Sequence, residues 1–264
     1  MINNKNDGTI HLPDELCIRM AAQIEQQLLP QTSPQIEGAE IAGWTLFSHS
    51  LGGDFFDYHD FQGVCCKSAS RMNVVVGDAC GHGLCSALLM TSTRSLLRAR
   101  AMHAGQISQV VTDVNVLLHM DIKESGHFIT LFYMSIYGPE KRIEWVRAGH
   151  PPALLYDPVK DEFISLYGEG VTLGVDPEYV YQSNSRTHLP DGAIVLIGSD
   201  GLWEMESGAD ESSCKKVLTD LVRKHRTGTA EVISQVIKKQ VELWCCNQAA
   251  QDDVSLVVVK FVNE

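Results

Sequence analysis

The sequence predicts an α+β fold in which β-sheets lie inside and helices cover them. Strand-like stretches occur in blocks that alternate with pairs of helix-like stretches, rather than with single helices. Hydrophobic residues make up 44% of the 264 residues and charged residues 20%, as in globular proteins. No internal repeat or low-complexity tract interrupts the chain. We therefore expect a flexible tail over residues 1–13, a helical segment over 14–35 and one domain over 36–264.

The first expected element is a helix over residues 14–29. Pro13 and Asp14 form a start signal, and Pro30 and Pro34 stop the helix. Its apolar side chains recur at helical spacing, at Cys17, Met20, Ala21, Ile24 and Leu28. We expect this stripe to pack on the core of the domain, because such stripes usually do. Docking of a partner or of a second copy of the chain is the alternative.

The remaining elements follow from hydrophobic periodicity and turn signals. Strands are expected over 41–50, 54–61, 71–79, 128–138, 141–149, 153–157, 162–168, 186–190, 193–200 and 254–262, and helices over 81–103, 106–121, 211–225 and 229–246. Residues 62–70 read as a hairpin connection. Gly138-Pro139 and Asp191-Gly192 predict two further hairpin turns.

Charge and hydropathy exclude several classes of protein. The net charge is −12, with 33 acidic residues against 21 Lys and Arg. Nucleic acids and anionic membrane surfaces need a basic footprint, so we expect neither as a partner. The polar start of the chain resembles neither a signal peptide nor a transit peptide. No apolar run approaches the ~20 residues of a membrane helix, so a cytoplasmic location is expected.

The eight cysteines predict neither a disulfide framework nor a zinc site. The chain is long for a disulfide scaffold, and CxxC spacing is absent. We expect reduced thiols that fill core positions.

Several aspartates stand at the ends of apolar strands. Asp54 follows two glycines, Asp78 ends VVVGD, Asp200 ends IVLIGSD, and Asp252 and Asp253 precede the last strand. A carboxylate at a buried strand end is unfavourable unless it is paired or binds a metal. The flanking segments contain no Lys or Arg. An ion-pair network is therefore a poor explanation, and convergence on a metal is the better one.

The type of ligand indicates the metal. Carboxylate oxygens suit Mg²⁺ or Mn²⁺ rather than Zn²⁺ or copper. Two such ions can share a bridging water, lower its pKa and direct it at an electrophile such as a phosphoryl group. No protein nucleophile is then required, which agrees with the absence of GxSxG, P-loop and HExxH motifs.

Eight segments, in this order, resemble the SpoIIE/RsbU-type branch of the protein phosphatase 2C superfamily. They are GGDFFDY (52–58), GDACGHG (77–83), LLM (88–90), FITLFY (128–133), RAGHPPALL (147–155), GVTLGV (170–175), IGSDGLWE (197–204) and DDVSLVVVK (252–260). Each segment alone is a weak signal, but the ordered set is specific and covers residues 15–262. The resemblance implies a four-layer α-β-β-α sandwich, with two antiparallel sheets flanked by helix pairs.

The resemblance also implies a site with two Mn²⁺ or Mg²⁺ ions between the sheets. Asp78 would bridge both ions, and the backbone carbonyl of Ala79 would bind one of them. Asp54 would bind the second ion, directly or through water. Asp200 and Asp252 would be the remaining ligands of the first ion. Asp78 and Asp200 would thus act in catalysis through the metals. Asp57 and Asp253 are weaker candidates.

Three basic residues near these segments have an open role. His82 and His150 could protonate the leaving serine alkoxide, but a structural role in a turn or at a strand end is favoured for each. Arg147 is a candidate for holding phosphate, with solvated surface as the default reading.

The resemblance implies a metal-dependent serine/threonine phosphoprotein phosphatase. The implied substrate is a phosphorylated STAS-domain anti-anti-sigma protein in bacterial partner switching. An upstream regulator or a homodimer would use the 14–29 helix. Two alternatives stay open: a catalytically silent phosphatase-like binding module, and a two-metal phosphatase of small phosphate esters.

Overall fold

A computed structural model describes residues 15–59, 70–103, 105–205, 211–247 and 252–263. Its elements are α1 (Glu15–Leu28), β1 (Ala39–Leu46), β2 (Asp54–His59), β3 (Arg71–Ala79), α2 (Leu84–Ala101), α3 (Ile107–Ile122), β4 (Ile129–Tyr137), β5 (Arg142–Ala148), β6 (Ala153–Asp157), β7 (Glu162–Leu166), β8 (Asn184–Arg186), β9 (Ile194–Gly198), α4 (Asp200–Trp203), α5 (Glu211–His225), α6 (Ala230–Asn247) and β10 (Val254–Phe261). The expected tail over 1–13 lies outside the described residues.

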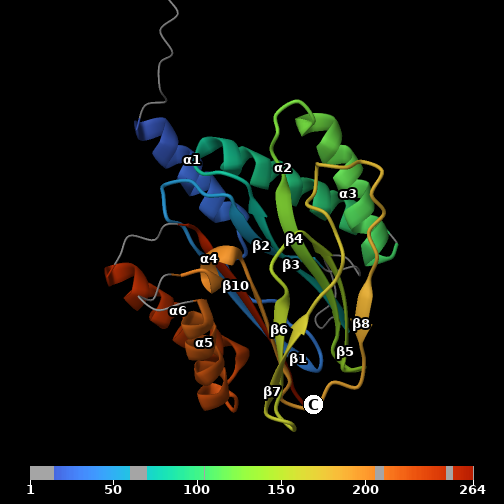
Figure 1. Cartoon of the computed structure of the whole chain (residues 1–264), viewed down its shortest axis with the longest axis vertical. Helices are drawn as coiled ribbons and strands as arrows, with labels where there is room; N and C mark the ends of the chain where they lie inside the picture. The colour runs from blue at the N-terminus through green and yellow to red at the C-terminus, as the bar shows by residue number, and fades with distance from the viewer. Residues whose placement is uncertain (1–14, 60–69, 104, 206–210, 248–251, 264) are drawn as a thin grey trace, which may run out of the picture.

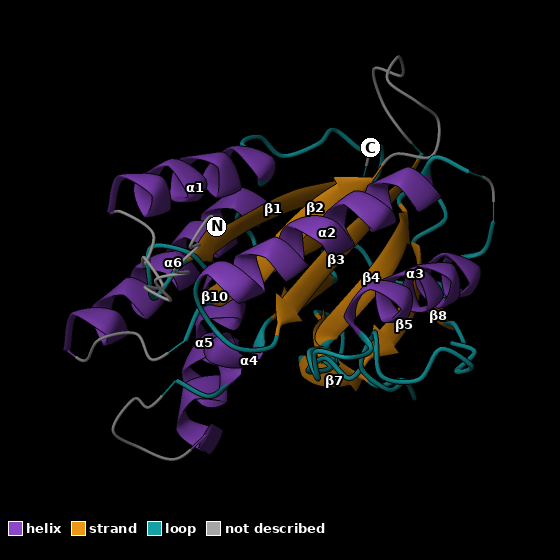
Figure 2. Ribbon diagram, turned by 90° about the horizontal axis from the view of Figure 1, so that it is seen from above, coloured by secondary structure: helices purple, strands orange, loops and turns teal. Residues whose placement is uncertain are grey.

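The strands form two antiparallel five-stranded sheets that pack face to face (Figure 1). One sheet has the order β1-β10-β9-β6-β7 and the other β2-β3-β4-β5-β8. Helices α2 and α3 cover the outer face of the second sheet (Figure 2), and α5 and α6 pack against the outer face of the first. The four-layer α-β-β-α sandwich expected from the sequence is thus confirmed.

Alternation along the strands assigns each side chain to a layer. In β3, Val74 and Val76 face the other sheet, whereas Val75 faces the helices. In β10, Val257 and Val259 point inward between the sheets, and Val258 faces α5 and α6. Because both faces of these central strands are buried, their sequences are nearly continuous apolar runs.

The hairpin predicted at Asp191-Gly192 is wrong. Strand β8 pairs with β5, whereas β9 pairs with β10 and β6, so the two segments belong to different sheets. The connection carries a buried Leu189 into the core between the sheets. A turn signal shows where the chain bends but not which strand it meets next. The hairpin at Gly138-Pro139 is confirmed by the pairing of β4 with β5.

The prediction that the α1 stripe packs on the core is also wrong for most of the stripe. Cys17, Met20 and Ile24 are exposed, and Ala21 and Leu28 are half-buried. Helix α1 lies beside α2 and turns another face to the domain (Figure 1). Periodicity identified the helix and its apolar stripe, but could not show whether the domain itself covers that stripe.

The cysteines only partly follow the expectation of core thiols. Cys214 is buried, whereas Cys17 and Cys85 are exposed. Cys65 and Cys66 lie outside the described residues. Among the helices that the structure describes, none has the length and apolar character needed to cross a membrane.

Candidate metal centre

Two of the predicted acids face each other across a pair of strands. Asp54 begins β2, Asp78 stands near the end of β3, and the two are register partners. They alternate in step with Phe56 and Val76, so both belong to the layer between the sheets. Directly opposed residues of an antiparallel pair have Cβ atoms roughly 4.5–5.5 Å apart. The two carboxyl groups therefore share one small region at the end of the sandwich.

The other sheet brings its acids to the same end. Asp200 opens α4 directly after β9, and Asp252 lies just before β10. These two strands are paired, with Leu256 opposite Gly198, so the end of one meets the start of the other. Strand β10 also contacts β2 and β3 across the interface between the sheets. Acids from four separate parts of the chain are thus assembled by the packing of two sheets.

Mutual repulsion and burial dominate the electrostatics of this group. Burial first, and then the charge of Asp78, hold the pKa of Asp54 well above its usual value. Burial and the neighbouring charges of Asp200, Asp252 and Asp253 raise the pKa of Asp78 to about 7. The pKa of Asp252 is raised as well, mainly by burial. Such a cluster of like charges is stabilised by a cation, which removes the repulsion between its members.

The residues present fit a hard divalent cation. The Oδ2 atom of Asp54 is buried and has no hydrogen-bond partner, and the donors of the group are all oxygen atoms, as Mg²⁺ and Mn²⁺ prefer. The carbonyl oxygen of Ala79 lies beside Gly53, where a Cβ would approach it to 2.4 Å. Within the described residues, no three His, Cys, Asp or Glu side chains already stand together at distances that would hold an ion.

Asp253 differs from its neighbour Asp252 in what it binds. Its Oδ1 accepts hydrogen bonds from the backbone N–H and the hydroxyl of Ser48, at 2.7 and 2.9 Å. Its Oδ2 accepts one from the N–H of Gly53 at 2.9 Å. A Cβ on Gly52 would come within 2.1 Å of that Oδ2, so only glycine fits there. Asp253 therefore holds the loop that presents Asp54, and its oxygens are already occupied.

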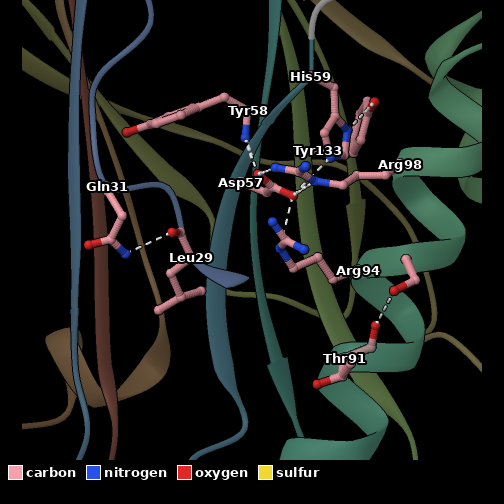
Figure 3. A network of polar contacts seen from close by, with 10 residues as sticks. Leu29, Gln31, Asp57, Tyr58, His59, Thr91, Arg94, Arg98 and Tyr133 are labelled. Atoms are coloured by element: carbon pink, nitrogen blue, oxygen red, sulfur yellow. Dashed lines mark hydrogen bonds and ion pairs between the residues drawn. The ribbon is translucent and has the colours of Figure 1, made fainter. Parts of the chain in front are cut away.

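Asp57 lies on the opposite face of its sheet. It is three residues from Asp54, and an odd separation along a strand reverses the face. Its carboxylate is fully buried and pairs with Arg94 at 3.0 Å and with Arg98 at 2.5 Å (Figure 3). The bond to Arg98, together with His59 and Arg94, outweighs burial and lowers the pKa of Asp57 to about 2. An ion-pair network, unlikely from the flanking sequence, thus explains this acid.

The two histidines occupy different environments. His150 is fully buried, its Nδ1 lies 2.7 Å from Thr130 Oγ1, and burial lowers its pKa to about 3. A neutral imidazole of this kind is a poor proton donor at neutral pH. His82 is exposed, follows a glycine with φ of +86° and stacks on His49 at 5.5 Å. Burial favours a structural role for His150, and the role of His82 stays a prediction.

Sequence reasoning overlooked Glu25 and His49. Glu25 is the one buried residue of α1, and both of its carboxyl oxygens face the N–H of Gly52, at 3.3 and 3.4 Å. Burial raises its pKa to about 7. His49 lies close enough to Asp252 to lower that carboxyl pKa. A lone acid in a helix and a lone histidine in a loop carry no spacing signal, so only the tertiary structure places them near the site.

The model of the family described as Stage II sporulation protein E (SpoIIE) matches residues 68–262. The chain belongs to the SpoIIE family. The chain is 25% identical over 246 residues to phosphoserine phosphatase RsbU of Bacillus subtilis (strain 168), covering 92% of this chain and 69% of RsbU. The domain is thus of the serine/threonine phosphatase class.

Solved structures agree with this fold. The SiaA-PP2C domain of Pseudomonas aeruginosa superposes with a TM-score of 0.73 at 16% identity, covering 92% of this chain and 95% of that one. RsbX, solved in complex with magnesium, gives a TM-score of 0.62 at 15% identity, covering 87% and 98%. At these identities the likeness concerns the fold, which is that of protein phosphatase 2C domains.

Proposed function

We propose that this chain is a metal-dependent phosphoprotein phosphatase whose Mn²⁺ or Mg²⁺ ions bind at the acids between the sheets. Asp54, Asp78, Asp200, Asp252 and the carbonyl of Ala79 are the proposed ligands. Ions bound there would supply Lewis acidity and lower the pKa of a water molecule. The observation that carries the proposal is the opposed pair Asp54–Asp78, with a buried Asp54 oxygen that lacks any partner.

Several observations support metal-dependent hydrolysis of the phosphate ester rather than catalysis by a protein nucleophile. The pKa values of Asp54, Asp78 and Asp252 are all raised by burial and by the other acids, so the group is poised to take up positive charge. His150 is buried, and burial lowers its pKa to about 3, so its neutral imidazole is a poor general acid at neutral pH. In this reaction the protein would hold the ions. Asp253 would fix the loop that presents Asp54, through its hydrogen bonds to Ser48 and Gly53.

We further propose that the substrate is a phosphorylated STAS-domain protein of a partner-switching pathway. The similarity to RsbU and the segments RAGHPPALL and DDVS support this choice. We expect rapid, Mn²⁺-dependent release of phosphate from a panel of phosphorylated STAS proteins, and slow release from unrelated phosphopeptides and nucleotides. The opposite ranking would contradict the substrate assignment. Binding of these proteins without turnover would instead favour the silent binding module.

The exposed stripe of α1 is the proposed contact for a regulator or a second copy of the chain. Replacing Met20 and Ile24 together by Gln should lower the mass measured by light scattering, or change the basal phosphatase rate, because both side chains are more than half exposed. Gln27→Ala, at an exposed polar position of the same helix, serves as the control. Unchanged mass and unchanged rate in the double variant would contradict this role of α1.

A further inference from the structure

A cavity adjoins the cluster of acids at the same end of the sandwich. It has a volume of about 630 Å³, and Asp200 lines it on one side. Its other walls come from both sheets and from α5, and we call it the Arg147 pocket. The lining residues used below are Thr130, Arg147, His150, Pro151, Trp203 and Lys215. Because the cavity is much larger than a phosphoryl group and adjoins a proposed ligand, it has room for part of a substrate beyond the phosphate.

Arg147 supplies a fixed positive charge to this pocket. It alternates in step with Ile143 and Trp145, so its side chain belongs to the layer between the sheets. Its Nε donates to the carbonyl of Gly168 at 2.7 Å, and its Nη1 donates to the carbonyl of His150 at 2.8 Å. Both partners are neutral, and no carboxylate pairs with Arg147 among the residues that the structure describes. A half-buried, unneutralised guanidinium held in one orientation is preorganised to bind an anion.

The rest of the lining carries a second cation, Lys215, and two acids, Glu204 and the proposed metal ligand Asp200. Lys215 is exposed on α5 at the edge of the pocket and has no carboxylate partner in the described chain. His150 contributes no charge, because burial keeps it neutral. Among the described residues, neither Arg147 nor Lys215 forms an ion pair with a carboxylate, although the net charge of the chain is −12. The two cations would attract an anion that the remainder of the molecule repels.

The geometry separates this anion from the scissile phosphoryl group. Strand β4 lies between β3, which carries Asp78, and β5, which carries Arg147. Two strand spacings amount to about 10 Å. The guanidinium is also held in place by the carbonyls of Gly168 and His150, at 2.7 and 2.8 Å. A phosphoryl group held at Asp78 would thus leave Arg147 free for a second anion on the same substrate.

We propose that the Arg147 pocket binds the polypeptide segment beside the phosphoserine, and that Arg147 and Lys215 select a carboxylate side chain in that segment. This inference rests on the proposed phosphatase function and names a specificity determinant for it. Pro151 and Trp203 form rigid, largely apolar walls against which the backbone of such a segment can pack. A charge-assisted hydrogen bond to Arg147 would strengthen binding of such a segment by about tenfold or more.

Two phosphoserine peptides test the proposal. They have the same length, and one carries Asp and Glu near the phosphoserine where the other carries Asn and Gln. With Mn²⁺ and the full chain, we expect kcat/KM to favour the acidic peptide by about tenfold or more. Arg147→Gln should remove most of this preference, and Lys215→Gln part of it. Arg142→Gln, on the same strand, and Lys216→Gln, next to Lys215, are matched controls that should keep it.

Each outcome decides the question. The absence of a preference in the native chain, or a preference that survives in both Arg147→Gln and Lys215→Gln, would overturn the proposal. If Arg147→Gln slowed both peptides equally, Arg147 would belong to the phosphoryl site instead. Lys215→Gln changes an exposed helix position, so it remains informative if Arg147→Gln fails to fold. If the native chain hydrolyses neither peptide, the proposed function fails, and Arg147-dependent binding of the acidic peptide still decides the pocket.

Discussion

Replacing Asp78 by Asn is expected to abolish phosphatase activity and, at the same time, to stabilise the metal-free protein at pH 8. Asp78 is the central acid of the group. It lies opposite Asp54, and the charges of Asp200 and Asp252 raise the pKa of its carboxyl group. Loss of a bridging ligand should lower the Mn²⁺-dependent rate by at least about 100-fold, since even residues that only orient ligands have effects of 10–100-fold.

The stabilising effect follows from the direction of the pKa shift. Burial and neighbouring acids raise the pKa of Asp78 from 3.8 to about 7 in the folded protein. The favourable contribution of the protonated form is complete below pH 3.8 and is lost as the pH rises through 7. Above pH 7 the ionised carboxylate opposes folding, and Asn removes that effect. We expect Asp78→Asn to melt about 2–4 °C or more above the native chain at pH 8 without metal.

Thermal melts with and without Mn²⁺ separate this interpretation from simple damage to the fold. Mn²⁺ should raise the melting temperature of the native chain, because an ion that binds only the folded state stabilises it. It should have little effect on Asp78→Asn. An Asp78→Asn protein that keeps Mn²⁺ stabilisation and activity would contradict the proposed metal centre. Failure of the native chain to bind Mn²⁺ would contradict it as well.

Replacing Asp57 by Asn is expected to have the opposite effect on stability. Asp57 is fully buried, and Arg94, which it pairs with, has a side chain only 7% exposed. Removing one partner of a buried ion pair leaves an uncompensated charge and costs about 3–5 kcal/mol. The melting temperature should therefore fall by roughly 10 °C at pH 7.

The pH dependence of this loss has a definite sign. The pKa of Asp57 is lowered to about 2, so its contribution to stability is present above pH 4 and is lost as the pH falls through 2. The difference between the native chain and Asp57→Asn, measured by urea unfolding, should shrink over that interval. Mn²⁺ should still stabilise the variant, because Asp57 lies on the other face of the sheet from the proposed ligands.

Asp113→Asn is the matched control for this prediction. Asp113 also pairs with an arginine, Arg100 at 2.5 Å, but its side chain is 36% exposed. Ion pairs at partly exposed sites contribute about 0–1 kcal/mol, so this variant should unfold close to the native chain. Equal, small losses in both variants would show that burial of the Asp57 network does not govern its strength.

The sequence by itself determined the class of fold, most of the elements and the family, but not α4, and its expected strand over 186–190 meets β8 only at Arg186. Local sequence patterns predict these elements. Alternating or continuous apolar residues indicate strands, and apolar residues at helical spacing indicate helices. The Gly138-Pro139 turn correctly predicted the pairing of β4 with β5, whereas the same type of signal at Asp191-Gly192 failed. The positions of Asp54, Asp78, Asp200, Asp252 and Asp253 at strand ends indicated a metal site, because burial of an acid there needs an explanation, and the family resemblance ranked Asp252 above Asp253.

Only the tertiary structure decided which side chains share an environment. The face on which Asp57 lies depends on where β2 begins, and Arg94 and Arg98 come from α2, far away in the sequence. The exposure of Met20 and Ile24 depends on which face of α1 meets α2. The assignment of β8 and β9 to different sheets, the contact of Glu25 with Gly52 and the fixed charge of Arg147 likewise come from packing. Local patterns encode which residues are apolar or charged, whereas register, layer and contact result from free energies summed over the whole chain.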